Sequence, residues 1–211
     1  MKKLLALVLL LPSTFWGANL KSPGANLIAS WSFDEGRGDV ALSSVGNLKG
    51  NVVGASWVDG RKGKALQFSG LGDHVNCGVE ASLNLTKGYA IEAWVKPEDP
   101  IRHSMTIVAK GWRYAGIYNL RMGTPWHHGK LMLVAQQRRT HEIPIAFNKW
   151  HHVTGVCDGQ RVGLFIDGKL VSVRPFVGGL KANNTPMTIG KCIGAPAGPN
   201  PKLAPEGQPF K

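Results

Sequence analysis

Apolar and polar residues alternate along most of the chain with the two-residue period of a β-strand. In the sequence RVGLFID, Val162, Leu164 and Ile166 fall on one face of a predicted strand. Asp167 and Gly168 form the kind of pair that supplies positive φ angles in a two-residue hairpin, and a second alternating segment follows. The pattern therefore predicts two antiparallel strands joined by a tight turn.

No stretch keeps the period of an amphipathic helix. Gly, Asn, Asp and Pro separate short apolar segments, as is typical of an antiparallel all-β domain. The predicted strands are residues 27–33, 65–69, 74–78, 89–96, 106–110, 117–121, 130–136, 151–157, 161–167, 170–173 and 187–190. A meander over residues 150–173 must bury its apolar face against a second sheet, which predicts a sandwich.

The N-terminal residues have a different pattern. Lys2 and Lys3 precede eight consecutive apolar residues at 4–11, and Pro12 ends this run. That order is typical of a secretory signal peptide, assigned here to residues 1–18, although the cleavage boundary is weakly marked. A membrane span needs about 20 apolar residues, and no later segment approaches that length. We expect an exported protein without a membrane span, located in the periplasm or secreted to the extracellular space.

The charge of the chain is strongly basic, with a formal net charge of +12. Between residues 102 and 150, Glu142 is the single carboxylate among eight basic residues: Arg102, Lys110, Arg113, Arg121, Lys130, Arg138, Arg139 and Lys149. Such a region attracts anions, which for an exported protein include acidic or sulfated polysaccharides, cell-wall polymers and lipid headgroups. The alternative is a basic surface that serves solubility. No nucleic-acid partner is expected, because no recognition helix or aromatic RNA-binding motif is visible.

Six segments follow one another along the chain: LIASWSFDEGRG, GKALQFSGLGDHVNCG, YAIEAWVKP, IVAKG, NKWHHVTGVCDGQRVGLFIDGKLV and MTIG. In order and spacing they resemble the laminin G-like, concanavalin A-like jelly-roll family, over about residues 27–190. The resemblance implies a two-sheet antiparallel jelly-roll sandwich, placed at residues 27–194 and followed by a Pro-rich segment at 195–211.

One departure from that family concerns its C-terminal strand. Members of the family continue into a closing strand that reads roughly Gly-x-Ile-Asp-Glu-Val, whereas this sequence ends at GQPFK. The resemblance therefore implies a fragment that lacks the last C-terminal strand. It also implies an unpaired edge along residues 27–33, and unprotected edges of this kind pair with other chains.

Catalytic groups are sparse. Glycoside hydrolases use two carboxylates that flank the scissile bond. Glu92 is the candidate on a central strand, and none of its same-face neighbours is acidic. The histidines at 151–152 would point to opposite faces of a strand and so could not chelate one ion. Those at 127–128 have no third ligand nearby. We expect no enzyme activity.

Calcium binding is an open alternative, and no other cofactor is predicted. The resemblance implies a calcium ion held by loop oxygens, and Asp34, Glu35 and Asp73 are the local candidates, although each suits a turn equally well. The three cysteines allow at most one internal disulfide, whose pairing is open, and buried thiols are the simpler expectation. They are Cys77, Cys157 and Cys192.

Aromatic and basic residues gather in the turn-rich segments GWRYAG and TPWHHG. Aromatic rings pack on sugar faces and Arg forks bind carboxylate or sulfate, although such rings can also pin loops to a sandwich. The predicted ligand-binding residues are Trp112, Arg113, Tyr114, Arg121, Trp126 and Arg138. Together these patterns predict a non-catalytic, exported recognition module for carbohydrate, with an acidic or sulfated glycan or glycoconjugate as candidate ligand. The alternatives are a protein-binding adhesion or assembly module, and an accessory-domain fragment of a larger secreted hydrolase.

Overall fold

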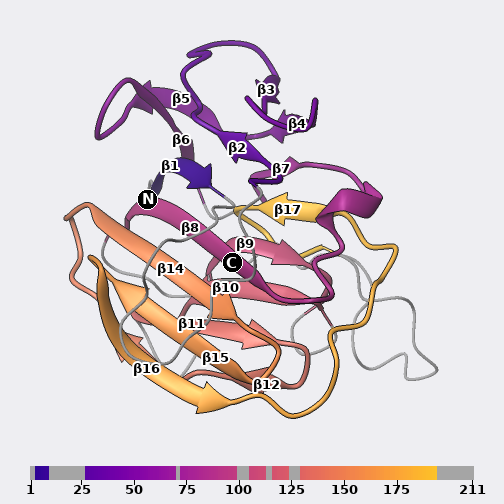
Figure 1. Cartoon of the computed structure of the whole chain (residues 1–211). Helices are drawn as coiled ribbons and strands as arrows, with labels where there is room; N and C mark the ends of the chain where they lie inside the picture. The colour runs from indigo at the N-terminus through magenta and orange to yellow at the C-terminus, as the bar shows by residue number, and fades with distance from the viewer. Residues whose placement is uncertain are drawn as a thin grey trace, which may run out of the picture.

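The protein is a two-layer sandwich of antiparallel β-sheets, with one sheet in front of the other in Figure 1. This computed structural model describes residues 3–9, 27–69, 72–98, 105–112, 116–123 and 129–193. The predicted all-β jelly-roll sandwich is confirmed. The Pro-rich segment at 195–211 lies outside the described residues.

The first sheet, called sheet A, has the strand order β16-β15-β14-β8-β1-β6-β5, and β2 pairs with β1. Its strands are β1 (Lys3–Leu9), β2 (Ser30–Trp31), β5 (Ser56–Asp59), β6 (Lys64–Phe68), β8 (Tyr89–Lys96), β14 (His151–Cys157), β15 (Arg161–Ile166) and β16 (Lys169–Pro175). The bounds of β8 and β14 agree with the sequence prediction, because both strands alternate strictly between the core and the outer face.

The second sheet, called sheet B, has the order β12-β11-β10-β9-β17-β7-β4-β3, and β13 pairs with β11. Its strands are β3 (Val40–Leu42), β4 (Lys49–Val53), β7 (His74–Asn76), β9 (Met105–Lys110), β10 (Tyr118–Met122), β11 (Lys130–Ala135), β12 (Arg138–Arg139), β13 (Ile143–Pro144) and β17 (Met187–Ile189). A single 3-10 turn, η1 (Ala81–Leu83), is the helical element of the described chain.

The core lies between the two sheets. Tyr89, Ile91, Ala93 and Val95 project from one face of β8 into it, as period-two alternation requires. Burying a large apolar side chain of this kind stabilises the fold by about 1.5–3 kcal/mol. The ring of Tyr89 meets that of Tyr118 on sheet B edge to face, with 5.3 Å between centroids, so aromatic packing joins the layers directly.

The predicted hairpin is confirmed. Asp167 has φ 50° and Gly168 φ 77°, the positive pair that the two-residue turn between β15 and β16 demands. The Asp167 carboxylate also accepts hydrogen bonds from His151 Nδ1 at 2.8 Å and from the backbone N–H of His152 at 2.9 Å. The turn therefore holds the start of β14 in place.

Residues 3–9 occupy a central position in sheet A. Strand β1 lies between β6 and β8, and it also pairs with β2 through Val8 opposite Trp31 and Leu9 opposite Ser30. At Ser30 and Trp31 the expected unpaired edge is therefore occupied by β1, and the predicted strand at 27–33 is reduced to these two residues. The apolar residues of the predicted leader suit a strand as well as a leader, because both need an uninterrupted apolar run.

The three cysteines are buried thiols rather than disulfide partners. Burial raises the pKa of Cys77 to about 12 and that of Cys157 to about 11, so both thiols are protonated and unreactive at neutral pH. In the described part of the chain, no helix has the length and apolar character needed to cross a membrane.

Candidate functional site

The outer face of sheet A carries a row of polar and aromatic side chains on β8 and β14. The alternation that turns Ile91 into the core turns Glu92 and Trp94 outward. Antiparallel pairing then places His152 opposite Trp94, and Thr154 opposite Glu92. Side chains directly opposite one another in such a pair are in contact range. These four residues therefore form one cluster on two adjacent strands.

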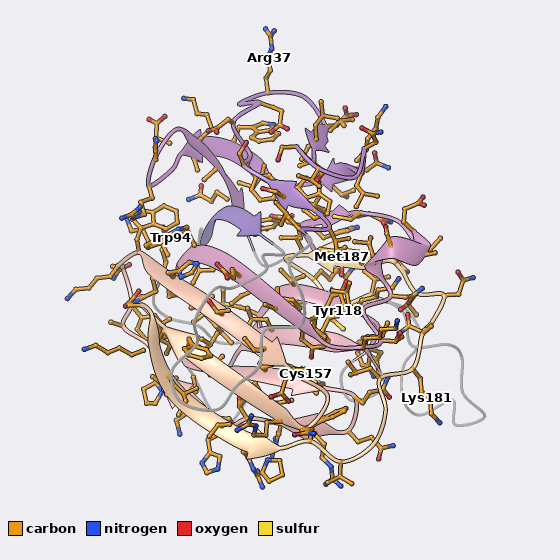
Figure 2. All side chains as sticks on the ribbon, viewed as in Figure 1. Arg37, Trp94, Tyr118, Cys157, Lys181 and Met187 are labelled. Atoms are coloured by element: carbon orange, nitrogen blue, oxygen red, sulfur yellow. The ribbon has the colours of Figure 1, made fainter. Side chains whose placement is uncertain are left out.

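Trp94 is the centre of this cluster, and it is labelled in Figure 2 near the turn of the β5–β6 hairpin. Its ring lies 5.1 Å from the His152 ring, centroid to centroid, with 40° between the ring planes. The guanidinium carbon of Arg61 lies 3.9 Å from the centre of a Trp94 ring. A cation over an indole face is attracted by the ring quadrupole. We call Arg61, Glu92, Trp94, His152 and Thr154 the Trp94 cluster.

Glu92 forms the acidic end of the cluster. Its Oε2 lies 3.1 Å from His152 Nε2, and its side chain is 6% exposed, against 25% for His152. A carboxylate buried to this degree needs a hydrogen-bonding or charged partner, and the imidazole supplies one. Glu92 therefore presents a fixed acceptor beside a half-exposed ring.

Thr154 adds an unused hydroxyl group. Its Oγ1 is buried and has no hydrogen-bond partner among the described residues. Buried hydroxyl groups are normally paired, so an unpaired one is an exception that invites a functional explanation. Its place opposite Glu92 puts a donor and acceptor next to the carboxylate.

Asp167 supports the cluster from behind by holding His151 and the backbone of His152. Burial raises the pKa of Asp167, but the hydrogen bonds from His151 and His152 lower it by more. The net pKa of this carboxyl group is therefore below its usual range. The carboxylate is therefore ionised at neutral pH, where it orients the first two residues of β14.

The predicted ligand-binding residues do not come together in the described part of the chain. Trp112 follows β9 and is half-buried, Arg121 on β10 is buried with 8% exposure, and Arg138 on β12 is exposed. Arg113, Tyr114 and Trp126 lie outside the described residues.

The predicted calcium ligands are each engaged in local structure. Asp34 Oδ1 accepts the backbone N–H of Lys64 at 2.9 Å, Glu35 Oε1 that of Leu42 at 2.7 Å, and Asp73 Oδ2 that of Ser69 at 2.5 Å. Glu35 Oε2 is buried without a partner in the described structure. Calcium takes six to eight oxygen ligands. Among the described residues no group of three or more His, Cys, Asp or Glu side chains suited to a metal occurs, and calcium binding at these three residues stays a prediction.

Sequence reasoning found only part of the Trp94 cluster. Strand alternation placed Glu92 on a central strand and excluded chelation by the histidines at 151–152, but neither Trp94 nor Arg61 was predicted to bind a ligand. The register of β8 against β14 would have linked His152 to Trp94, since both strand bounds were predicted correctly. Arg61 lies in the turn of another hairpin, and no local sequence pattern predicts its contact with Trp94.

Comparison with known structures shows the same fold at low sequence identity. Domain 4 of AbnA, an extracellular arabinanase of Geobacillus stearothermophilus solved with arabinotriose, superposes with a TM-score of 0.56 at 17% identity, covering 80% of this chain and 81% of that domain. The binding domain of botulinum neurotoxin serotype D gives 0.56 at 15% identity, covering 74% of this chain and 42% of that one. The binding domain of serotype C1 gives 0.53 at 13% identity, covering 77% and 42%. The chain thus spans less than half of the toxin domains that it matches.

No curated protein matches the sequence. The family model of the concanavalin A-like lectin/glucanase superfamily matches residues 68–199, which is more than half of the chain. The matched segment holds β8 and β14, the two strands that carry most of the Trp94 cluster. The protein belongs to the concanavalin A-like lectin/glucanase superfamily.

Proposed function

We propose that the protein is a non-catalytic, exported carbohydrate-recognition module that binds its ligand at the Trp94 cluster. The observation that carries the proposal is the half-exposed Trp94 ring, which is in contact with Arg61 and His152. The apolar C–H groups of a sugar pack on such a ring, and fixed polar groups around it select the orientation of the hydroxyl groups.

The polar groups of the cluster match the needs of a sugar. The exposed Arg61 guanidinium donates hydrogen bonds to sugar hydroxyl groups, while the buried Glu92 carboxylate holds the half-buried His152 ring beside Trp94. A single carboxylate in the cluster supplies neither of the two-carboxylate mechanisms of glycoside hydrolysis. These points support recognition without catalysis.

Two further considerations support the proposal. The structural neighbours are described as an arabinanase domain in complex with arabinotriose and as toxin binding domains, which agrees with a recognition role. The N-terminal basic and apolar segment has the order of a secretory leader and favours export, so the protein would meet polysaccharide or glycoconjugate outside the cell or in the periplasm. The same apolar run forms β1, so cleavage after residue 18 would leave the exported module without that strand.

One observation favours a protein-binding function as the second candidate. The edge strand β16 and the residues after it expose apolar side chains, with Leu170 40%, Val173 45% and Val177 71% exposed. Apolar groups on an edge strand suit contact with another polypeptide. A module of this kind would bind protein and ignore sugar.

The test compares two tryptophan variants in binding to a panel of soluble neutral and acidic polysaccharides, measured by affinity electrophoresis and titration calorimetry. Trp94→Ala should weaken binding at least ten-fold, because the stacking face is lost. Trp112→Ala is the matched control from the segment that the sequence favoured, and it should change binding less than two-fold. Equal melting temperatures would establish that both variants are folded. If no polysaccharide binds, or if Trp94→Ala binds like the parent, the proposed function is wrong.

A further inference from the structure

We propose that the pairing of Arg61 with Trp94 makes this a site for carboxylated sugars, with Arg61 as its specificity-determining residue. The inference rests on the proposed function, since it names the class of sugar bound at the same cluster. It differs from the sequence prediction, which assigned the anion to the basic segment at 102–150.

Arg61 projects from a fixed turn. It lies in the β5–β6 hairpin, where the backbone N–H of Gly60 donates to the Gly63 carbonyl at 2.9 Å. Two ties flank this turn: Lys64 Nζ pairs with Asp59 at 2.7 Å, and the Lys64 N–H is bound by Asp34. The base of the Arg61 side chain is therefore well positioned.

The charge of Arg61 is not neutralised within the described structure. Arg161 is paired with Asp158, and Arg139 with Glu142, whereas the described residues provide Arg61 with an aromatic ring and no carboxylate. A guanidinium on a ring is held in orientation by that contact. Arg61 therefore combines a defined place with an unused positive charge.

The geometry of a stacked guanidinium indicates the ligand. The Arg61 guanidinium carbon lies over the Trp94 ring, 3.9 Å from its centre, and no carboxylate of the described residues occupies its N–H groups. Two parallel N–H groups match the two oxygens of a carboxylate, and such bidentate pairs are stronger than neutral hydrogen bonds. A uronic acid supplies a carboxylate attached to a ring that can pack on the indole.

The rest of the cluster agrees with a sugar that carries both a charge and hydroxyl groups. Glu92 is already paired with His152, which lowers its repulsion of an incoming anion. Glu92 and Thr154 are buried, so the exposed Arg61 and the half-buried Trp94 and His152 are the groups of the cluster that a sugar can reach. Recognition of the carboxylate is thus assigned to Arg61.

The test measures the affinity of the full chain for polygalacturonate, for the same polymer after chemical reduction of its carboxyl groups, and for dextran sulfate. Arg61→Gln should weaken binding to polygalacturonate about ten-fold, which corresponds to about 1.4 kcal/mol. Arg61→Lys keeps the charge but loses the planar fork, and it should still weaken binding several-fold. Arg37→Gln is the matched control, because Arg37 is an exposed arginine on another turn, labelled in Figure 2, and it should change binding less than two-fold.

Each other outcome has a distinct meaning. Equal binding of the carboxyl-reduced polymer, still lost in Trp94→Ala, would overturn the carboxylate inference and leave the proposed function standing. Equal losses in Arg61→Gln and Arg37→Gln would reveal only general charge attraction and overturn the role of Arg61. The same dependence on Arg61 with dextran sulfate would make the site a general anion site and overturn its specificity for carboxylates. Failure of every polymer to bind would overturn the proposed function itself.

Discussion

The basic segment at 102–150 and the short basic turn that begins at Arg61 differ in how their cations are placed. The segment is rich in cations, yet Lys110 is fully buried, with Nζ donating to the Thr185 carbonyl at 2.8 Å, and Arg121 is buried on β10. Arg61 stands in a short turn and reaches the face of Trp94 on another strand. Two of the residues that make the segment basic are therefore not available to a ligand, whereas Arg61 is.

The largest expected effect concerns the sheet that carries the Trp94 cluster. Removal of residues 1–18, as expected for a cleaved leader, takes β1 from between β6 and β8 and leaves sheet B intact. The exposed strand edges should lower the melting temperature by roughly 10 °C, about 3 kcal/mol for a domain of this size, and promote self-association. Calorimetry and size-exclusion chromatography with light scattering, at equal concentrations of both chains, provide the measurement. A shorter chain that is monomeric and melts at the same temperature would contradict the structural role of β1.

The second prediction separates the two kinds of cation directly. Lys110→Ala should lower the free energy of unfolding by about 2–4 kcal/mol, because the packed stem is lost and the Thr185 carbonyl loses its donor. Arg61→Ala should change it by less than about 0.5 kcal/mol, since Arg61 is an exposed turn residue. Urea unfolding gives both values. Similar values for the two variants would remove the contrast between buried and available charge.

The third prediction concerns the unused hydroxyl in the cluster. Thr154→Val should leave stability unchanged or raise it by up to about 1 kcal/mol, because an unpaired buried hydroxyl is costly. The same change should leave sugar binding unchanged, because the hydroxyl is buried. Thermal melting and calorimetric titration of one protein sample test both parts. A clear loss of stability would mean that the hydroxyl has a structural partner in the folded protein.

The smallest expected effect is acid sensitivity at Asp167. Because its folded pKa is lowered, its contribution to stability is present above about pH 4 and is lost as the pH falls through the folded pKa. Asp167→Asn keeps a residue that tolerates positive φ, so it should melt below the parent at pH 5, and the difference should shrink at pH 2.5. A constant difference at both pH values would show that the carboxylate charge is not involved.

Much of the fold could be predicted from the sequence, because alternation is strict wherever one strand face is buried. Tyr89–Lys96 and His151–Cys157 follow this rule, and Asp167-Gly168 is a strong turn signal. Strands β3, β4 and β5 were not predicted. They are short and lie toward the ends of their sheets, and apolar residues such as Leu42 and Val53 are exposed there, so the pattern carries no clear period.

The site was harder to predict than the fold for a physical reason. Alternation within β8 places Glu92 and Trp94 together, but their partners depend on strand register and on a turn from a distant hairpin. Arg61 and Trp94 are brought together by tertiary packing alone. A local run of charge, by contrast, is conspicuous in a sequence even where folding buries its members, as it does with Lys110 and Arg121.

The most direct test of carbohydrate recognition at the Trp94 cluster is a titration of the ¹⁵N-labelled protein with oligogalacturonate, observed through the indole N–H signals of its seven tryptophans. Trp94→Phe and Trp112→Phe assign the two signals that matter. The Trp94 signal should shift progressively and saturate with the calorimetric affinity, while the Trp112 signal stays in place. A saturating shift of Trp112 with Trp94 unmoved would contradict the account and return the ligand to the segment that the sequence favoured.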